Sequence, residues 1–377
     1  MSETPASRLD RPAFLEDPAL RAVLAALPEA RLVGGAVRDA IAGRPIADID
    51  LATPLPPEQV TAALLRAGLK AVPTGLDHGT ITAIADHRGF EVTTLRHDLK
   101  TDGRHAKVAF TDDWSADAAR RDFTINALSM TPDGEIFDYY NGITDLKAGR
   151  VRFVGEARLR IAEDFLRILR YFRFLARYGV GEPDQAATAA IRAGVPGLAQ
   201  LSGERLWSEL KRILVTPDPW PALTLMRDLG VLDAVLPPTH PSAFADLTDN
   251  DPVLMLAALG SRDISRLRLS TAEQDKLAAF HAAPALPNDA ADADIRRALA
   301  DTPPEILTGR ARLAHRDPAR IQATPPPVFP LQGRDLKAAG IPPGSEMGAL
   351  LRDLRAWWLD RGCEGDVAAE LARRLSG

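Results

Sequence analysis

The stretch LVGGAVRDAIAGRPIADIDLAT, residues 32–53, is the most informative part of this chain. It contains two aspartates, Asp48 and Asp50, separated by one apolar residue. Side chains of a β-strand alternate between its two faces, so a strand over residues 48–52 would present both carboxylates on one face. Two carboxylates this close repel each other unless a cation lies between them. Oxygen ligands suit Mg²⁺, which takes the rest of its shell from water and phosphates.

The same stretch begins with a Gly-Gly pair at a predicted turn. Without a Cβ, the backbone N–H groups of Gly34 and Gly35 can approach a phosphate closely. The following sequence is neither a P-loop nor a dinucleotide-binding fingerprint, and such a pair is more often a plain turn before a helix. Arg38, on that helix, is placed either to reach a phosphate or to form a surface salt bridge with Asp39 or Asp48, and the local sequence favours neither role.

A third carboxylate lies further along the chain. Glu91 belongs to FEVTTLR, residues 90–96, where polar and apolar residues again alternate. A half-buried strand of this kind would direct Glu91 toward the open face of a sheet. Carboxylates supplied by two strands are what a two-metal site requires, in which metals ~3.5–4 Å apart stabilise the attacking and leaving oxygens. We therefore expect Asp48, Asp50 and Glu91 to form one catalytic group.

Composition and charge exclude several classes of protein. The chain has 377 residues, 46% hydrophobic and 26% charged, which is ordinary for a globular protein of about two to four domains. Its one cysteine, Cys363, cannot form an intrachain disulfide, so we expect a reducing compartment, the cytoplasm. The N-terminus lacks a signal-peptide core, and no apolar run approaches the ~20 residues that span a bilayer. A net charge of -5 argues against wholesale coating by nucleic acid but is compatible with a local basic surface.

The periodicity divides the chain into an α/β part and a helical part. Through about residue 150 it predicts helices over 20–27 and 57–69 and strands over 31–33, 48–52, 80–85, 90–96 and 107–110. The segment RLRIAEDFLRILRYFRFLARYGV, residues 158–180, is predicted to be helical with one apolar face and to end at Gly179. Residues 282–305 and 317–330 have the composition of linkers, and residues 331–376 are expected to hold one loop and two helices.

Further motifs follow in a fixed order. They are RRDFTINAL (120–128), DYYNGITDLKAGRVR (138–152), EDFLRILRYFRF (163–174) and SGERLWSELKRIL (202–214). Together with the Gly-Gly turn and the carboxylates, they resemble the class II CCA-adding enzymes and bacterial poly(A) polymerases, within the polymerase-β type of nucleotidyltransferases. The resemblance covers roughly residues 30–280. A weaker match, LQGRDLKAAGIPPGSEMGALL (331–351), resembles the tail of the same enzymes.

The resemblance implies an α+β fold in four parts. These are a polymerase-β-like nucleotidyltransferase head of mixed sheet and helices (1–148), then an all-α neck (149–215), body (216–305) and tail (306–377).

It also implies roles for individual residues. Asp48 and Asp50 would bind two Mg²⁺ ions, and Glu91 would support the attacking 3′-hydroxyl. Gly34, Gly35 and Arg38 would contact the phosphates of the nucleotide. Its ribose would be contacted by Arg121, Asp122 and Asn126. A structural alternative pairs the arginines of the RRD motif with Asp117 and Asp122 at a helix start.

Base choice is expected to lie with Asp164 and Arg167, which together with Glu163 match the base-selecting motif of these enzymes. On a helix, their i, i+3 spacing places them on one face. A carboxylate accepts from the exocyclic amine of cytosine or adenine, and an arginine donates to the ring nitrogen, whereas uracil and guanine would put a carbonyl against the carboxylate. The alternative is an intrahelical salt bridge between the two residues, which spacing alone favours.

Arg170 belongs to a stripe of arginines on the same segment, with Arg167, Arg173 and Arg177. The stripe is expected either to meet triphosphate or RNA backbone or to form a solvated helix face. Arg205, together with Lys211, is a weaker candidate for the same contacts.

The segment after Glu91 separates the related enzymes. Residues 101–119, TDGRHAKVAFTDDWSADAA, resemble the flexible loop of CCA-adding enzymes, and Asp102-Gly103 is a turn signal within it. The strongly basic C-terminal extension of the related poly(A) polymerases is not found. We therefore expect template-independent addition of the 3′-terminal CCA to tRNA from CTP and ATP, with no obligate protein partner and no membrane. The alternatives are a poly(A) polymerase, an A-only enzyme and a catalytically silent RNA-binding protein.

Overall fold

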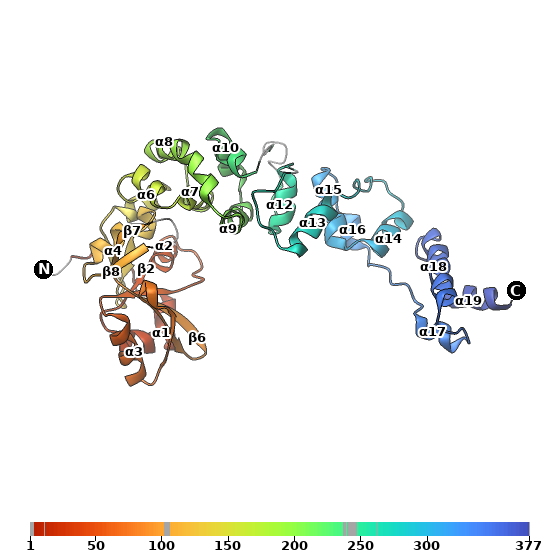
Figure 1. Cartoon of the computed structure of the whole chain (residues 1–377), viewed down its shortest axis with the longest axis horizontal. Coiled ribbons are helices and arrows are strands. Elements are labelled where there is room, and N and C mark those ends of the chain that lie inside the picture. Colours follow the sequence, from red (N-terminus) through yellow and green to blue (C-terminus); the bar gives the residue numbers. More distant parts are fainter. Residues whose placement is uncertain are drawn as a thin grey trace. The chain divides into compact units, whose positions relative to one another are not determined.

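The computed structural model describes residues 4–10, 12–101, 106–236, 239, 247–261 and 263–376. The turn predicted at Asp102-Gly103 lies outside these residues. The chain divides into two compact units, residues 1–239 with 263–268 and residues 240–262 with 269–377. The expected α+β architecture is confirmed, because the first unit contains a mixed sheet with helices and the second is built of helices (Figure 1).

An eight-stranded sheet organises the first unit, in the order β1-β10-β9-β2-β3-β6-β5-β4. Neighbouring strands run antiparallel except β3 and β6, which run parallel. The strands are β1 (Ser7–Arg8), β2 (Arg31–Val33), β3 (Asp50–Thr53), β4 (Lys70–Gly75), β5 (Thr80–Ala85), β6 (Arg88–Thr94), β9 (Leu128–Met130) and β10 (Glu135–Asp138). A separate hairpin pairs β7 (Arg96–Thr101) with β8 (Ala106–Phe110). Because Val33 is the partner of Asp50, the end of β2 lies beside the start of β3.

Two helices, α1 (Pro18–Ala26) and α3 (Pro57–Arg66), pack on the strands at the β4 end of the sheet. Asp17 accepts two backbone N–H groups at the start of α1, and α3 has a proline in its first turn, so both begin with favoured N-terminal residues. Their apolar faces and the inward strand residues form one core. The shorter elements are α2 (Gly35–Ile41), α4 (Trp114–Ala119), α5 (Gly142–Lys147) and the 3₁₀ turns η1 (Ala13–Glu16), η2 (Leu76–His78) and η3 (Thr124–Asn126).

Most predicted strands of the first unit are confirmed with shifted ends. The predictions over 31–33 and 80–85 match β2 and β5. The strand predicted over 48–52 is wrong at its start, since β3 begins at Asp50 and Asp48 precedes it. The common direction of these two carboxylates therefore does not follow from strand periodicity. Strand β4 was not predicted because it is mostly exposed and contains a proline, which leaves no alternating pattern.

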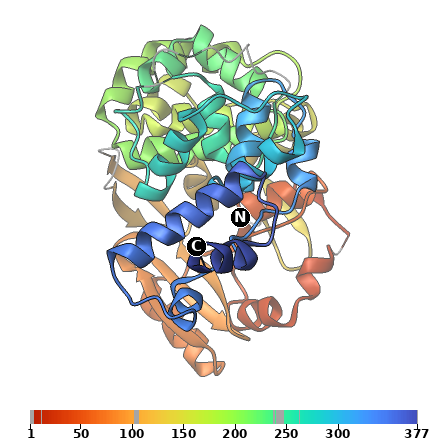
Figure 2. The ribbon, with the colours of Figure 1, turned by 90° about the vertical axis from the view of Figure 1, so that its right-hand side faces the viewer.

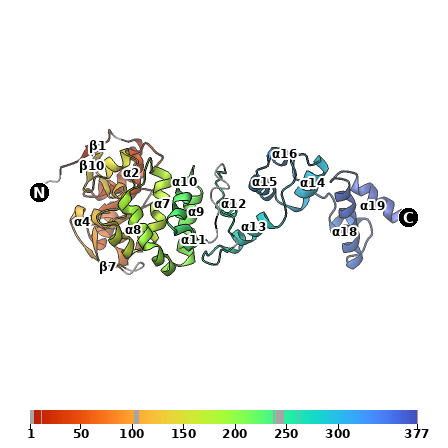
Figure 3. The same cartoon turned by 90° about the horizontal axis from the view of Figure 1, so that it is seen from above.

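The rest of the first unit is helical. It contains α6 (Ala157–Glu163), α7 (Leu166–Tyr178), α8 (Gln185–Gly194), η4 (Val195–Gln200), α9 (Gly203–Leu214), α10 (Trp220–Asp228) and α11 (Val231–Val235). Helix α7 packs against α9 and α10 (Figure 3). It ends at Gly179 as predicted. Its buried surface is wider than the predicted single face, because Tyr171 and Phe174 are buried as well as Ile168 and Phe172.

The predicted helix through Asp164 is interrupted, which corrects the sequence prediction. Asp164 has extended backbone angles, φ −156° and ψ 107°, between α6 and α7. Its Oδ1 accepts the backbone N–H of Leu166 at 3.0 Å. An aspartate that bonds the first N–H groups of a helix competes with continued helix, so α6 ends and α7 starts here.

The second unit contains α12 (Pro252–Ala258), α13 (Thr271–His281), α14 (Asp292–Asp301), α15 (Pro304–Leu313), α16 (Ala319–Ala323), α17 (Gly333–Ala338), α18 (Ser345–Asp360) and α19 (Val367–Ser376). The linker predicted over 282–305 is wrong, because α14 lies within it and buries Ile295 and Leu299 one helical turn apart. The last block holds three helices instead of two, and α17 and α19 both pack on α18 (Figure 2). No helix among the described residues is both long and apolar enough to cross a membrane.

Candidate active site

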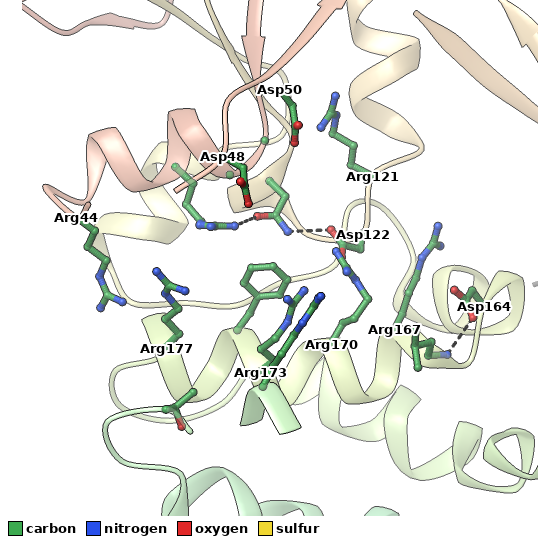
Figure 4. A pocket seen from close by; sticks show the side chains of 18 of the residues that line it. Arg44, Asp48, Asp50, Arg121, Asp122, Asp164, Arg167, Arg170, Arg173 and Arg177 are labelled. Carbon is green, nitrogen blue, oxygen red and sulfur yellow. Dashed lines mark hydrogen bonds and ion pairs between the residues drawn. The ribbon is translucent and has the colours of Figure 1, made fainter. Parts of the chain in front are cut away.

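A large cavity of about 1340 Å³ lies within the first unit (Figure 4). Of its 24 lining residues, eleven are arginines and four are aspartates, so positive charge dominates. The charged residues are Arg38, Arg44, Arg96, Arg120, Arg121, Arg167, Arg170, Arg173, Arg177, Arg205 and Arg212, with Asp48, Asp50, Asp122 and Asp164. A cavity with this size and charge suits a polyanionic small molecule.

The Gly-Gly turn connects β2 to α2 at the wall of this cavity. Gly34 has φ +63° and ψ −118°, a combination that residues with a Cβ avoid. A Cβ on Gly34 would also lie 3.1 Å from Nη1 of Arg121. Glycine is therefore required here by the backbone conformation and by the close approach of a cationic side chain. Gly35, the first residue of α2, lines the cavity as well.

Two of the three predicted carboxylates line the cavity, and the third, Glu91, lies on the strand beside Asp50. Asp48 and Asp50 both line the cavity, and Figure 4 shows their side chains directed into it. Asp50 is the register partner of Glu91 on the parallel strand β6. Burial, together with the negative charges of Glu91 and Asp48, raises the pKa of Asp50, and Arg121 opposes this rise only in part.

This repulsion among acidic groups fits a divalent cation. Among the described residues, no three acidic, histidine or cysteine side chains converge closely enough to hold an ion by themselves. Mg²⁺ usually keeps several waters and binds through one or two carboxylates together with substrate phosphates. The pair Asp48 and Asp50, in a cavity suited to phosphates, matches that ligand set.

Arg38 is buried in the cavity wall and held by several partners. Its Nε and Nη2 each donate to the carboxylate of Asp39 at 3.1 Å, and its Nη1 donates to Oδ1 of Asn126 at 2.5 Å. Its guanidinium lies over the rings of Phe174 and Tyr178, at 5.0 and 4.6 Å. The salt bridge with Asp39 that the sequence left open is therefore present, but it is buried, and it fixes Arg38 where a ligand can reach it.

Arg120 and Arg121 share the buried carboxylate of Asp117, at 2.7 and 3.0 Å. Burial alone would raise the pKa of Asp117, but the two arginines outweigh it and hold that pKa below its usual value. The structural alternative for the RRD motif is thus correct for Asp117. Both arginines still line the cavity, and Figure 4 shows Arg121 beside Asp50.

Asp122 is buried, and both oxygens of its carboxylate have protein partners. Oδ1 accepts from the backbone N–H of Phe123 and from Nδ2 of Asn126, both at 2.9 Å. Oδ2 accepts from Nε of Arg170 at 2.7 Å, and Nη2 of Arg170 forms an ion pair with the same oxygen at 2.6 Å. Burial would raise its pKa, but Arg170 and these hydrogen bonds hold the pKa below its usual value. Asp122 therefore holds both Asn126 and Arg170 in place, and its predicted contact with the ribose stays a prediction.

The two expected base readers line the same cavity but do not share a helix face, which corrects the prediction. Asp164 lies in the break before α7, and Nη2 of Arg205 donates to its Oδ2 at 2.8 Å. Arg167, in the first turn of α7, donates from Nη1 to Oε2 of Glu163 at 2.5 Å and to the carbonyl of Arg160 at 2.8 Å. The single intrahelical pair considered from the sequence is therefore replaced by two separate pairs.

All four arginines of the predicted stripe line the cavity. Arg170 pairs with Asp122, and Nε of Arg173 lies 3.1 Å from Oε2 of Glu209. Glu209, on α9, is only 4% exposed and also lies 3.9 Å from Nη1 of Arg170. Arg177, the last arginine of the stripe, is exposed. The alternative prediction, a helix face in contact with solvent, therefore applies to this residue alone.

Sequence reasoning missed four lining arginines: Arg44, Arg96, Arg120 and Arg212. Arg120 and Arg212 lie inside motifs that were singled out, so a survey of every cation in those motifs would have found them. The anchoring role of Glu209 depends on the packing of α9 against α7, which carries no sequence signal.

Three comparisons place the chain among known proteins. Residues 30–152 match the family "Poly A polymerase head domain", and residues 182–242 match "Probable RNA and SrmB- binding site of polymerase A". The chain is 40% identical over 364 residues to human mitochondrial CCA tRNA nucleotidyltransferase 1, covering 89% of this chain and 83% of that protein. The Bacillus stearothermophilus CCA-adding enzyme in complex with CTP is similar with a TM-score of 0.73 and 25% identity, over 96% of this chain and 98% of that one. The Thermotoga maritima CCA-adding enzyme complexed with tRNA shares the fold, with a TM-score of 0.66 and 19% identity, over 97% of this chain and 99% of that one.

Proposed function

Because this chain belongs to the family of CCA tRNA nucleotidyltransferases, the class II CCA-adding enzymes, we propose that it builds and repairs the 3′-terminal CCA of tRNA. It transfers nucleotidyl groups from CTP and ATP to a 3′-hydroxyl, releases pyrophosphate and uses no nucleic-acid template. One observation carries this proposal. The Gly34 turn, the carboxylates Asp48 and Asp50, and the side chains of Asp164 and Arg167 all line one cationic cavity.

Asp48 and Asp50 hold two Mg²⁺ ions in this proposal, in keeping with the use of metal ions by polymerase-β-type nucleotidyltransferases. The raised pKa of Asp50 supports it, because a cation relieves the repulsion from which that rise partly comes. When bound, such ions lower the pKa of a substrate hydroxyl and neutralise charge on departing pyrophosphate. Glu91, beside Asp50, accepts a hydrogen bond from the attacking 3′-hydroxyl and orients it.

The triphosphate is held by the turn and by fixed arginines. The backbone N–H groups of Gly34 and Gly35 donate to phosphate oxygens. Arg38 adds charge at little entropic cost, because its partners already fix its guanidinium before substrate binds. Burial would lower the pKa of Arg170, but Asp122 and neighbouring acidic groups raise it above its usual value, so Arg170 stays cationic.

Ribose recognition is assigned to Arg121 and Asn126, and Asp122 positions the second of these. Nδ2 of Asn126 donates to Asp122 and its Oδ1 accepts from Arg38, so the orientation of the amide is fixed from both sides. A fixed amide can discriminate a ribose hydroxyl, because a substrate without that hydroxyl leaves a polar group unpaired.

Base choice is assigned to Asp164 and Arg167. The carboxylate accepts from the exocyclic amine of cytosine or adenine, and the guanidinium donates to the ring nitrogen. Uracil and guanine present a carbonyl to Asp164, which leaves two acceptors facing each other. The protein thereby supplies the hydrogen bonds that a template strand supplies in other polymerases.

tRNA binding is proposed for the helical parts of the chain. The match to an RNA-binding region over residues 182–242 supports this for α8 to α11. The division into head (1–148), neck (149–215), body (216–305) and tail (306–377) is kept as part of the proposal. The cytoplasm remains the expected compartment, although the human relative is named as mitochondrial. Cell fractionation tests this expectation.

Incubation of the purified protein with tRNA lacking CCA, with each NTP alone and then with CTP and ATP together, tests the proposed reaction. The expected products are tRNA ending in CC from CTP alone and in CCA from both. A long A tract would identify a poly(A) polymerase. A single A added only to tRNA that already ends in CC would identify an A-only enzyme, and tRNA binding without incorporation would identify a silent RNA-binding protein.

A further inference from the structure

We propose that Arg205 is a positioning residue for base selection, because it fixes the carboxylate of Asp164 in the orientation that reads the incoming base. The inference rests on the proposed function and deepens it. It assigns the specificity of the pocket partly to α9, a helix that follows the base-reading segment in the chain and packs against α7.

The position of Asp164 explains why it needs an outside partner. Because the residue lies in the break between α6 and α7, regular helical packing does not fix its side chain. Oδ1 accepts the N–H of Leu166 at 3.0 Å, and Oδ2 accepts Nη2 of Arg205 at 2.8 Å. The two contacts hold different oxygens, so together they determine the rotation of the carboxylate. With the Leu166 contact alone, the carboxylate could turn about that bond.

The arrangement leaves Asp164 able to bind a base. Each carboxylate oxygen has two acceptor positions, and the contacts with Leu166 and Arg205 use one on each oxygen. Asp164 lines the cavity, so the remaining positions are available to an exocyclic amine. Arginine has only donors, and an ionised carboxylate has only acceptors, so this pair presents a fixed acceptor to the base.

The second base reader does not depend on this pair. Arg167 is held by Glu163 and by the carbonyl of Arg160, both from α6. Removal of Arg205 therefore frees Asp164 and leaves the anchors of Arg167 in place. The side chains of Arg205 and Asp164 are only 26% and 23% exposed, so solvent screens their interaction less than it screens a surface pair.

Loss of Arg205 should weaken the rejection of uracil. Uracil is excluded because its carbonyl meets a carboxylate that cannot turn away. A carboxylate free to rotate would relieve that contact, and the penalty on UTP would fall. Selection of cytosine would weaken at the same time, because orienting the acceptor would then cost conformational freedom on binding. The phosphate chemistry is assigned to Asp48 and Asp50, which belong to the head of the chain, and we expect the removal of Arg205 to affect it less.

The test measures single additions to tRNA lacking CCA by the full chain and three variants. Arg205→Met removes the donor and the charge, Arg205→Lys keeps a charged donor, and Arg66→Met is the matched control, an exposed arginine of α3 outside the cavity. We expect the ratio of kcat/KM for CTP to that for UTP to fall about tenfold or more in Arg205→Met, the effect of losing one charge-assisted hydrogen bond. Arg205→Lys should recover much of that ratio, and Arg66→Met should leave it unchanged.

The melting temperature and the tRNA affinity of each variant show whether Arg205 acts only through the stability of the protein or through tRNA binding. If Arg205→Met lowers the rates with CTP and UTP equally, or leaves their ratio intact in a folded protein, the inference is wrong. Should Arg205→Met fail to fold, Arg205→Gln takes its place, because glutamine keeps a donor without the charge. Its ratio of kcat/KM for CTP to that for UTP should then be lower than the ratio of Arg205→Lys. An unchanged ratio in folded Arg205→Gln would contradict the inference. If the unaltered protein adds neither C nor A, the proposed function fails, and if it adds both while the ratio is insensitive to Arg205, only the present inference fails.

Discussion

Asp50 on β3 lies opposite Glu91 on β6, in the only parallel strand pair among the described strands of the sheet. Parallel register partners point to the same face, so the fold itself places the two carboxylates side by side. The chain reaches this arrangement through α3, β4 and β5, which lie between the two strands in sequence. The raised pKa of Asp50 is the electrostatic result, and it supports the assignment of a cation site at this edge.

Replacing Asp50 should raise the stability of the protein and abolish its activity. A pKa raised in the folded state means that the folded protein binds this proton more tightly than the unfolded chain does, so ionised Asp50 destabilises the fold as pH rises through that pKa. We expect Asp50→Asn to unfold at a higher temperature than wild type at pH 7 without metal, and this gain should vanish as pH falls through the Asp50 pKa. Incorporation of both CTP and ATP should drop to background. Retained incorporation would contradict the metal assignment.

The same site predicts a pH-dependent response to Mg²⁺. Protons compete with the metal for Asp50, so Mg²⁺ should raise the melting temperature of the wild-type protein more at pH 8 than at pH 5. Calorimetric titration with Mg²⁺ alone, without nucleotide, measures the same trend as affinity. Asp50→Asn should bind Mg²⁺ weakly at every pH. Equal stabilisation of wild type and variant would show that the ion binds elsewhere.

Gly34→Ala should damage the nucleotide site more than the fold. The new Cβ meets Arg121 at 3.1 Å, and the positive φ of this position strains any residue other than glycine. We expect kcat/KM for both nucleotides to fall about tenfold or more, an effect of at least ~1.4 kcal/mol. Gly68→Ala is the matched control, because Gly68 also has positive φ, +76°, but no atom within 4 Å of an added Cβ and no place in the cavity. Similar kinetic losses in both variants would point to general strain.

Asp122→Asn should be costly because it leaves the half-buried guanidinium of Arg170 without its main partner. Breaking a buried ion pair on one side typically costs about 3–5 kcal/mol. The pKa of Asp122 is lowered in the folded state, so its contribution to stability is present above the unfolded pKa and is lost as pH falls through the folded value. Urea unfolding should therefore show a large difference from wild type at pH 7 that narrows below about pH 4. The exposed Asp133→Asn serves as control, and a comparable loss there would contradict this account.

The sequence predicted the chemical groups of the site better than their contacts. Asp48, Asp50 and Glu91 were found from alternation and from the order of motifs, because these signals are local. The pairing of Asp50 with Glu91 depends on sheet register, and the partner of Asp164 lies on another helix. Contacts between distant segments leave no local pattern in a single sequence.

The main errors in the fold also have physical causes. The segment through Asp164 has helical periodicity on both sides, so the break appears only once the side chain is seen to accept the N–H of Leu166. The segment 282–305 has a linker-like composition, but two apolar residues, Ile295 and Leu299, suffice to bury one side of α14. Composition measures the average polarity of a segment, whereas burial depends on the few residues that face the core.

The central claim is that the protein itself selects the base, through Asp164. The most direct measurement incubates tRNA lacking CCA with equal concentrations of all four NTPs and sequences the 3′ ends made by the wild-type protein and by Asp164→Ala. We predict that wild type yields ends reading CCA, and that the folded variant also incorporates U or G. A variant that still adds only C and A in the same order would contradict the claim.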